Sequence, residues 1–280
     1  MSAGFLEGMA AASAARVAAA RARVSEGELQ ARALATPRPP PLALSAAGFD
    51  LIAELKLRSP AAGALGARTD DLARRVGAYA RGGAAAVSVL TEPARFDGAL
   101  EHLATASEAL RTARVPAMRK DFLVDPYQVL EARAAGAGGV LVILRMLSSA
   151  QADALIACAR ECGLFTLLEA FDEADIERAR GLVEPSGAAA QLLLVGLNCR
   201  DLDTLEVVPG RLEALAARLP ASVPRVAESG VASALDAARV AAAGYDLALV
   251  GSALMSERDP ARLVREMLAA ARRARAAVEA

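Results

Sequence analysis

The stretch "RKDFLVDPYQVLEARAAG", residues 119–136, joins the end of a strand to a complete helix pattern. Its first three residues are charged, and they directly follow an apolar "VPAM" segment. Asp125 and Pro126 are typical of an N-cap and a first helical residue, and Gly136 is typical of a helix stop. A strand covered on both faces has no structural need for such charges. Lys120 is therefore expected to point into a cavity that stabilises its charge.

The same succession of an apolar strand and a helix pattern repeats from residue 50 onward. The expected strands cover residues 50–56, 84–91, 115–120, 138–144, 164–170, 191–198, 223–228 and 246–251. Between them, helices are expected to start and stop at Asp70 and Gly82, Ser149 and Gly163, Asp172 and Gly181, and Ser233 and Gly244. Short, continuously apolar strands that are each followed by a helix predict the α/β class and a (β/α)8 TIM barrel.

Polar or small residues end nearly every expected strand, and their distribution separates two α/β architectures. They are Glu54, Lys56, Ser88, Thr91, Arg119, Lys120, Glu169, Asn198, Arg200, Glu228, Ser229, Gly251 and Ser252. A doubly wound open sheet gathers its ligand residues at one switch point, whereas a barrel brings the carboxyl ends of all its strands to one mouth. The distribution favours the barrel, with a mouth in which carboxylates and lysines shift each other's pKa.

The ends of the seventh and eighth strands carry a second pattern, "AESG" (227–230) and "VGSAL" (250–254). Glycine allows close approach to the backbone, and the free N–H groups at a helix start attract anions. Barrels often bind phosphate at this position. The sequence thus predicts a small phosphate-ester ligand whose other end reaches Lys120 and Glu169.

Composition argues against several other classes of protein. The chain has 280 residues, a net charge of −1 and no tryptophan, which disfavours a generally cationic nucleic-acid binder and a base-stacking surface. No apolar run is long enough to span a bilayer. Cys158, Cys162 and Cys199 do not resemble a disulfide framework. With His102 as the only histidine, neither a metal site nor a cofactor is expected.

The first 45 residues are predicted to form a helical extension with a Pro-rich connector, and residues 46–280 to form the barrel catalytic domain. "TPRPPPL" (36–42) cannot form a regular helix and is typical of a stiff, extended segment. Three glutamates among the first 28 residues are atypical of a transit peptide. The expectation is a cytoplasmic protein, as a monomer or a weak homo-oligomer.

Separate blocks of the chain resemble the indole-3-glycerol-phosphate synthase family in the family's order and spacing. They are "IAELKLRSPAAG" (52–63), "SVLTEPARFDG" (88–98), "RKDFLVDPYQVLEARAAGA" (119–137), "LLEAFDEADIERA" (167–179), "VGLNCRDLDTLEV" (195–207), "VAESGV" (226–231) and "LVGSALM" (249–255). The resemblance implies a carboxy-lyase of tryptophan biosynthesis. In its reaction, 1-(2-carboxyphenylamino)-1-deoxyribulose 5-phosphate closes a ring, loses CO₂ and water, and becomes indole-3-glycerol phosphate.

The resemblance also implies roles for individual residues. Lys120 resembles the general acid that drives ring closure, and Glu169 resembles the base for dehydration. Lys56 resembles the second lysine, which contacts the phosphate or acts as an acid. The other implied catalytic residues are Glu54, Asn198 and Glu228. The implied substrate-binding residues are Ser59, Phe96, Phe122, Arg200, Ser229, Gly230, Leu249, Gly251 and Ser252, with the two phenylalanines as walls for the anthranilate ring.

Some positions depart from the family pattern and leave alternatives open. Ala61 stands where members often have serine, Phe171 where many have a polar residue, and the segment before the first strand lacks a clear match. A paralogue that serves a specialised indole pathway is one alternative, and a barrel that binds a phosphate ligand without turnover is another. A relative of phosphoribosylanthranilate isomerase would need a Cys/Asp pair at strand ends, and Cys199 follows the sixth strand instead of ending the first.

Overall fold

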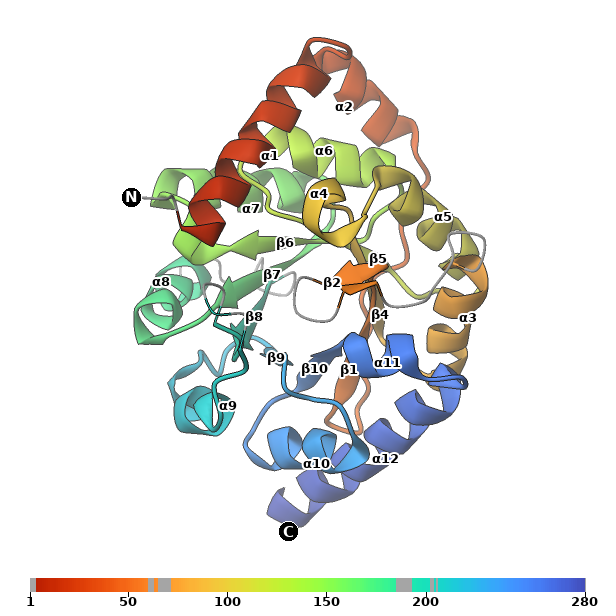
Figure 1. Ribbon diagram of the computed structural model, residues 1–280, viewed down its shortest axis with the longest axis vertical. Coiled ribbons are helices and arrows are strands. Elements are labelled where there is room, and N and C mark those ends of the chain that lie inside the picture. Colours follow the sequence, from red (N-terminus) through yellow and green to blue (C-terminus); the bar gives the residue numbers. More distant parts are fainter. Residues whose placement is uncertain are drawn as a thin grey trace.

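The barrel predicted from the sequence is present in the computed structural model, which describes residues 4–59, 63–64, 72–184, 193–201, 204 and 206–279. Parallel strands close in the order β1-β10-β9-β8-β7-β6-β5-β4, with helices around them (Figure 1). The strands are β1 (Asp50–Leu55), β4 (Ala86–Leu90), β5 (Ala117–Lys120), β6 (Gly139–Ile143), β7 (Phe165–Ala170), β8 (Leu193–Asn198), β9 (Arg225–Glu228) and β10 (Leu247–Val250). Each expected strand has its counterpart, and residues 191–192 lie outside the described part.

Helices follow the barrel strands in the order expected for a (β/α)8 fold. They are α3 (Leu72–Gly82), α4 (Pro93–Phe96), α5 (Leu100–Leu110), α6 (Pro126–Ala134), α7 (Ser149–Glu161), α8 (Glu173–Val183), α9 (Arg211–Leu215), α10 (Ala234–Ala242), α11 (Ser252–Ser256) and α12 (Pro260–Glu279). The described part of the chain also contains the short 3₁₀ turns η2 (Leu144–Met146) and η4 (Ala216–Arg218) and a small hairpin of β2 (Arg58–Ser59) and β3 (Gly63–Ala64).

The helix signals in the opening stretch act as predicted. Asp125 caps α6 by accepting a hydrogen bond from the Tyr127 amide at 2.8 Å, and Pro126 is the first helical residue. Gly136 lies just beyond the helix with φ 85°, a conformation that glycine adopts at little cost.

Two of the expected helix boundaries were wrong. Helix α7 is capped by Ser148 instead of Ser149, since Ser148 and Gln151 form a reciprocal capping box. Helix α8 does not stop at Gly181 but continues to Val183, which is 2% exposed in the hydrophobic core. Burial of Val183 outweighs the low helix propensity of the glycine. The predicted start at Asp70 lies outside the described residues.

The alternation of side chains along β1 decides which of its residues face the barrel interior. Leu51, Ala53 and Leu55 face the surrounding helices and belong to the large hydrophobic core. Ile52 belongs to the second cluster, which fills the barrel interior. Because side chains two residues apart share a face, Glu54 follows Ile52 on the inner face, one step closer to the mouth.

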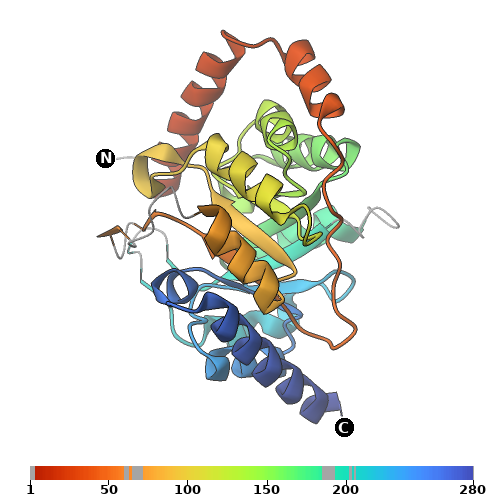
Figure 2. The ribbon, with the colours of Figure 1, turned by 90° about the vertical axis from the view of Figure 1, so that its right-hand side faces the viewer.

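Two N-terminal helices, α1 (Phe5–Arg21) and α2 (Glu26–Ala35), form an arch beside the barrel, and α2 packs on α6 (Figure 2). The buried Ser13 hydroxyl of α1 donates to the Phe122 carbonyl, so α1 is attached directly to the segment that follows β5. The predicted helical extension is therefore packed on the barrel, whereas the proposed domain division after residue 45 stays a prediction.

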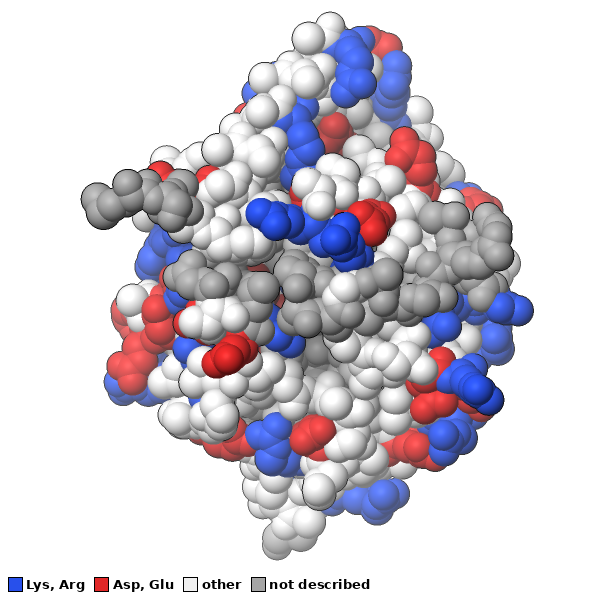
Figure 3. Space-filling view, in the orientation of Figure 1, with Lys and Arg blue, Asp and Glu red and all other residues white. Residues whose placement is uncertain are grey.

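Acidic and basic side chains of the described residues are interspersed on the face shown in Figure 3. None of the described helices is both long enough and apolar enough to cross a membrane.

Candidate active site

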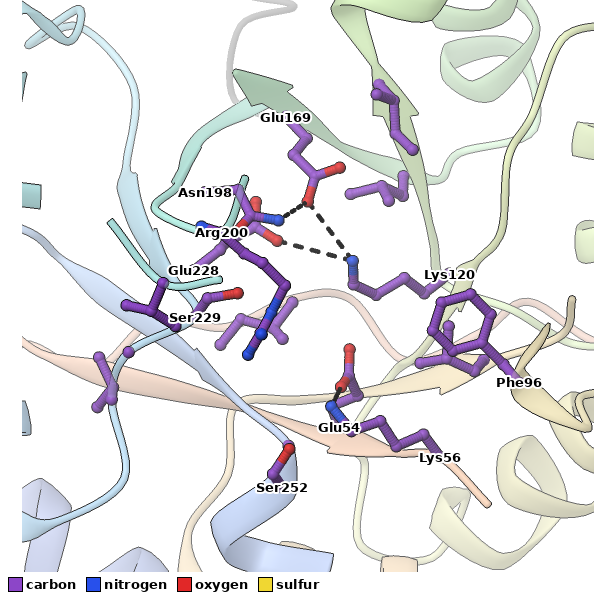
Figure 4. Close-up of a pocket in the computed structure, with 18 of the residues that line it drawn as sticks. Glu54, Lys56, Phe96, Lys120, Glu169, Asn198, Arg200, Glu228, Ser229 and Ser252 are labelled. Carbon is purple, nitrogen blue, oxygen red and sulfur yellow. Dashed lines mark hydrogen bonds and ion pairs between the residues drawn. The ribbon is translucent and has the colours of Figure 1, made fainter. Parts of the chain in front are cut away.

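A cavity of about 340 Å³ lies at the carboxyl ends of the strands and brings most of the predicted site residues together (Figure 4). Among the residues that line it are Glu54, Lys56, Phe96, Lys120, Phe122, Glu169, Asn198, Arg200, Glu228, Ser229, Gly230, Leu249, Gly251 and Ser252. The side chain of Ser59, and Ala61, lie outside the described part of the structure. Charged, apolar and small residues from separate strands thus converge on one space, whereas the role of each remains a prediction.

Lys120 ends β5 and points into this cavity. Its Nζ lies 3.6 Å from Glu169 Oε1 and 3.9 Å from Glu228 Oε2. Burial acts to lower the pKa of Lys120, but the attraction of Glu169, Glu228 and Glu54 outweighs it and raises the pKa above its ordinary value. The side chain is therefore protonated at neutral pH, which is the form that a general acid requires.

Arg119 and Asp121, the sequence neighbours of Lys120, are held by hydrogen bonds and ion pairs. Arg119 is buried and donates to Thr91 Oγ1 at 3.1 Å and to the Gln128 carbonyl at 2.8 Å. The Asp121 carboxylate lies 3.1 Å from Arg119 and 2.7 Å from Arg16 of α1. These contacts hold the segment around Lys120 in place, and Asp121 also forms part of the cavity wall.

Lys56 and Lys120 are the only two lysines in the sequence, and every other basic residue among the 32 Lys and Arg is arginine. An arginine side chain stays protonated throughout the accessible pH range, whereas a lysine can give up a proton. Both lysines of the chain thus line this one cavity.

Asn198 holds Glu169 in a defined orientation. The Asn198 amide donates to Glu169 Oε1 at 2.8 Å, and Asn198 Oδ1 accepts from the backbone N–H of Arg200 at 2.9 Å. The second contact fixes which end of the amide faces the carboxylate. Because Asn198 is itself held by the backbone of Arg200, it fixes the orientation of the Glu169 carboxylate.

Glu228 lies in a space that a glycine on the next strand leaves open. Among the described residues, neither Glu228 oxygen has a hydrogen-bond partner. A Cβ added to Gly196 would collide with Glu228 Oε1 and lie 3.1 Å from Leu167. The sequence analysis missed Gly196, because its importance depends on a side chain of another strand.

The environment of Glu228 favours its neutral form. Burial, followed by the negative charge of Glu169, raises the pKa of Glu228 well above its usual range, and Lys120 offsets this only in part. Glu228 can therefore hold a proton under conditions in which an exposed glutamate would be ionised.

We expect Glu228→Gln to stabilise the fold more as the pH rises. In the unfolded chain Glu228 ionises near its ordinary pKa of about 4.3, whereas the folded protein keeps the proton to higher pH. The folded state binds more protons in that window, so wild-type stability falls as pH rises through it, and glutamine removes this loss. Melting temperatures at pH 5 and pH 8 test this, with the exposed Glu108→Gln as control. An equal effect of Glu228→Gln at both pH values would contradict the expectation.

Glu54 and Lys56 form an ion pair beside a second open glycine. Lys56 Nζ lies 2.8 Å from Glu54 Oε1. Burial acts to raise the pKa of Glu54, but Lys56 and then Lys120 outweigh it and keep the pKa below its usual value. A Cβ on Gly251 would collide with the Glu54 carboxylate and lie 3.0 Å from Lys56 Nζ. The pair therefore packs directly against the turn that was predicted to bind phosphate.

The two predicted anion-binding turns border the same cavity. After β9, Ser229 and Gly230 both have a left-handed backbone, with φ of 64° and 69°. After β10, Gly251 precedes α11, which begins at Ser252. Both turns thus bring the backbone to the mouth, and Gly251 lies next to the Lys56 ammonium.

Three phenylalanines form an apolar wall of the same cavity. The ring centroid of Phe122 lies 6.2 Å from that of Phe96 and 6.0 Å from that of Phe5, the latter in an edge-to-face arrangement. Phe5 comes from α1 and was missed by the sequence analysis. A signal was present, since Phe5 and Met9 are four residues apart and both pack on the interior cluster.

Comparisons with known proteins identify the family. The profile of the family "Indole-3-glycerol phosphate synthase" matches residues 6–267. The indole-3-glycerol phosphate synthase of Micrococcus luteus is 44% identical over 225 residues, covering 80% of this chain and 79% of the relative. That of a Nocardioides species is 45% identical over 231 residues, covering 82% and 84%.

The fold has wider similarity among solved structures. Thiamine phosphate pyrophosphorylase from Pyrococcus furiosus superposes with a TM-score of 0.56 at 17% identity, over 81% of this chain and 97% of that protein. At this identity the likeness concerns the barrel alone. The profile match and the identity to the two bacterial relatives, together with the converging strand-end residues, establish that the chain belongs to the indole-3-glycerol phosphate synthase family.

Proposed function

We propose a division of labour within the reaction of this family, which forms indole-3-glycerol phosphate in tryptophan biosynthesis. Lys120 is the general acid for ring closure, and Glu169 is the base for dehydration. The observation that supports this division is the placement of one lysine within 4 Å of two carboxylates at the base of an otherwise partly apolar cavity.

The first step needs an acid at the ketone of 1-(2-carboxyphenylamino)-1-deoxyribulose 5-phosphate. Lys120 donates a proton to the ketone oxygen while the aromatic carbon that bears the carboxylate attacks the carbonyl carbon. A raised pKa makes the lysine reluctant to release its proton. The alkoxide that develops on the ketone oxygen is basic enough to take it.

The later steps need a dry pocket and a base. Loss of CO₂ restores the aromatic ring, so it depends on excluding water more than on an added acid or base. Dehydration then removes the hydroxyl as water and a proton from the ring, and Glu169, oriented by Asn198, accepts that proton. Glu228, which favours its neutral form, can return a proton to Lys120 or to the leaving hydroxyl.

The substrate is proposed to lie across the mouth. Its phosphate binds the backbone at Gly230, Gly251 and Ser252 beside Lys56, and its anthranilate ring packs against Phe96 and Phe122. The basis is that the turns and the aromatic wall line one cavity, with Phe96 across it from Ser229 (Figure 4). Phe5 adds to the wall from α1.

Lys56→Met is expected to raise KM and to change kcat less than Lys120→Met does. A phosphate contact persists from the bound substrate to the transition state. Its loss therefore weakens the binding of the substrate and of the transition state equally, which raises KM and leaves kcat nearly unchanged. Lys56→Arg, which keeps the positive charge, is the matched control and should recover part of the affinity. Steady-state kinetics of both variants test this. A fall in kcat at unchanged KM would instead make Lys56 a second acid.

Product analysis tests the function itself. The purified protein, incubated with the carboxyphenylamino-deoxyribulose phosphate, should release one CO₂ for each indole-3-glycerol phosphate, followed by indole fluorescence. Binding of the substrate without product would favour the non-catalytic barrel. The isomerase alternative lacks support, because Cys199 is 2% exposed, and its sulfur would lie 3.0 Å from a Cβ at Gly230, behind the turn.

We also propose a cytoplasmic protein that is a monomer or a weak homo-oligomer. A charged phosphate ester is retained where it is made, and the free cysteines fit a reducing compartment. The large exposed apolar residues among those described come from separate segments of the chain: Leu34, Leu44, Val207, Leu235 and Val278. Cell fractionation and sedimentation velocity measurements test the two parts separately.

A further inference from the structure

A second cavity, of about 650 Å³, lies outside the barrel between α2, the Pro-rich connector, α6 and the end of α7. Figure 1 shows α2 as one side of the N-terminal arch, with α6 and α7 below the arch. None of its lining residues lines the first cavity. Both thiols of α7, Cys158 and Cys162, line it, and the proposed function uses neither.

The two thiols are adjacent and only partly buried. They lie one helical turn apart, and Cys162 is the C-terminal cap of α7. Cys158 Sγ lies 3.7 Å from the Pro126 carbonyl, to which its S–H donates, and the same S–H can instead donate to the Cys162 sulfur. A thiol that donates to its neighbour stabilises the neighbour as a thiolate.

A buried arginine stands beside this pair. Arg133 is 6% exposed, and its Nη2 donates to the Thr36 carbonyl at 2.7 Å. Its Nη1 has no hydrogen-bond partner among the described residues. An unpaired buried N–H is costly, so negative charge on the nearby sulfur relieves it.

These contacts act on Cys162 in one direction. The hydrogen bond from Cys158 and the charge of Arg133 outweigh the effect of burial and lower the pKa of Cys162 to about 7. The pKa of Cys158 is raised, chiefly through the same hydrogen bond. Burial raises the pKa of Cys199, the third cysteine. Of the three thiols, Cys162 is the one whose surroundings favour the thiolate.

We propose that Cys162 is a nucleophilic thiolate and that this cavity takes a small anionic disulfide, leaving a mixed disulfide on Cys162. Arg38, Arg133 and Arg160 line the cavity and favour an anionic partner. Of the two acidic residues there, Glu26 is paired with Arg21 at 2.9 Å.

The exchange step is balanced without a further reagent. The Cys162 thiolate attacks one sulfur of R–S–S–R, a new S–S bond joins Cys162 to that sulfur, and R–S⁻ leaves with the electron pair of the broken bond. Cys162 is oxidised and the departing thiolate is reduced. Residues four apart on a helix have Cβ atoms about 5–6 Å apart, whereas a disulfide needs about 3.5–4.5 Å. The intact helix therefore stops the reaction at the mixed disulfide.

The reduced full-length protein treated with 5,5′-dithiobis(2-nitrobenzoate), an anionic disulfide, tests this. Release of the coloured thiolate should show that one thiol per chain reacts fast. Peptide mass spectrometry should map this thiol to Cys162, and the pH profile of its reaction rate should have a midpoint near pH 7. Cys162→Ser should remove that equivalent and leave synthase turnover unchanged. Two fast equivalents, or a fast equivalent at Cys158 or Cys199, would overturn the proposal.

Variants of Cys158 separate the hydrogen bond from simple exposure. Cys158→Ala should move the pH midpoint upward, toward the ordinary thiol value of about 8.5. At pH 7 a shift to that value lowers the thiolate fraction about 15-fold and raises the reactivity of each thiolate about 5-fold, so the reaction slows up to about threefold. Cys158→Ser keeps a donor and should keep the midpoint near 7. Equal midpoints for alanine and serine would contradict the mechanism.

Two further controls vary the charge of the disulfide reagent and test whether the thiol pair binds a metal ion. The anionic reagent should react faster than the cationic disulfide cystamine at low salt, and Arg38→Gln should reduce the difference. Among the described residues there is no cluster of three or more His, Cys, Asp and Glu that could hold a metal. Tight, stoichiometric binding of Cd²⁺ that blocks the fast equivalent would nevertheless reassign the pair to a soft metal ion and overturn the proposal.

Discussion

Lys120→Met will lower kcat at least about 10²-fold, because it removes the proton donor for ring closure and keeps most of the side-chain volume. Lys120 Nζ lies within 4 Å of Glu169 and Glu228. Loss of the ammonium leaves two carboxyl groups facing each other, and Glu228, whose pKa is already raised, can take up a proton in its place. The melting temperature should therefore change little at or below neutral pH.

Lys120→Arg is the matched control for this variant. It keeps the positive charge beside Glu169 and Glu228 but does not release a proton at accessible pH. If proton transfer is the role of Lys120, arginine should restore little of the lost kcat. An active Lys120→Arg enzyme would show that positive charge alone suffices. Unfolding of Lys120→Met with unchanged turnover per folded molecule would make the lysine structural.

Glu169→Gln will lower kcat by about 10²–10⁴-fold with a small change in KM, because it removes the base and keeps the shape of the side chain. The glutamine carbonyl can still accept the hydrogen bond from Asn198, which now meets Glu169 Oε1 at 2.8 Å. Steady-state kinetics and thermal unfolding on the same preparation check this.

Asn198→Ala is the comparison for that variant, because it leaves the Glu169 carboxylate in place and removes only the hydrogen bond that orients it. Its loss of kcat should be smaller than that of Glu169→Gln. A Glu169→Gln enzyme within a few fold of wild type would rule out a catalytic base at this position.

The fold followed from the sequence because its signals are local. Each strand is a short apolar run between helix caps, and polar strand ends distinguish a barrel from an open sheet. Cap residues such as Asp125 and Ser233 act within three residues of themselves, so they too could be placed in advance. The misplaced end at Gly181 shows the limit, since the burial of Val183 is a tertiary effect.

The site was predicted as a set of strand ends, and what was missed depends on neighbours distant in sequence. Gly196 looks like an ordinary strand residue until its register beside Glu169 and its proximity to Glu228 are known. Phe5 reaches the cavity only because Ser13 and Arg16 fix α1 to the segment after β5. A pattern within one element cannot reveal such contacts.

The two-lysine composition is a signal that sequence alone does offer. In a chain that otherwise uses arginine for positive charge, the two positions that keep lysine are candidates for a functional role. Both lie in one cavity, with their ammonium groups beside buried carboxylates.

The division of labour between Lys120 and Glu169 is tested most directly by single-turnover measurement of CO₂ and indole-3-glycerol phosphate on the same samples. The account predicts that Lys120→Met slows both products equally, because ring closure precedes both. Glu169→Gln should release CO₂ well before the indole product, because only dehydration needs its base. CO₂ and indole-3-glycerol phosphate that appear together in Glu169→Gln, both slowed to the same extent, would contradict the account.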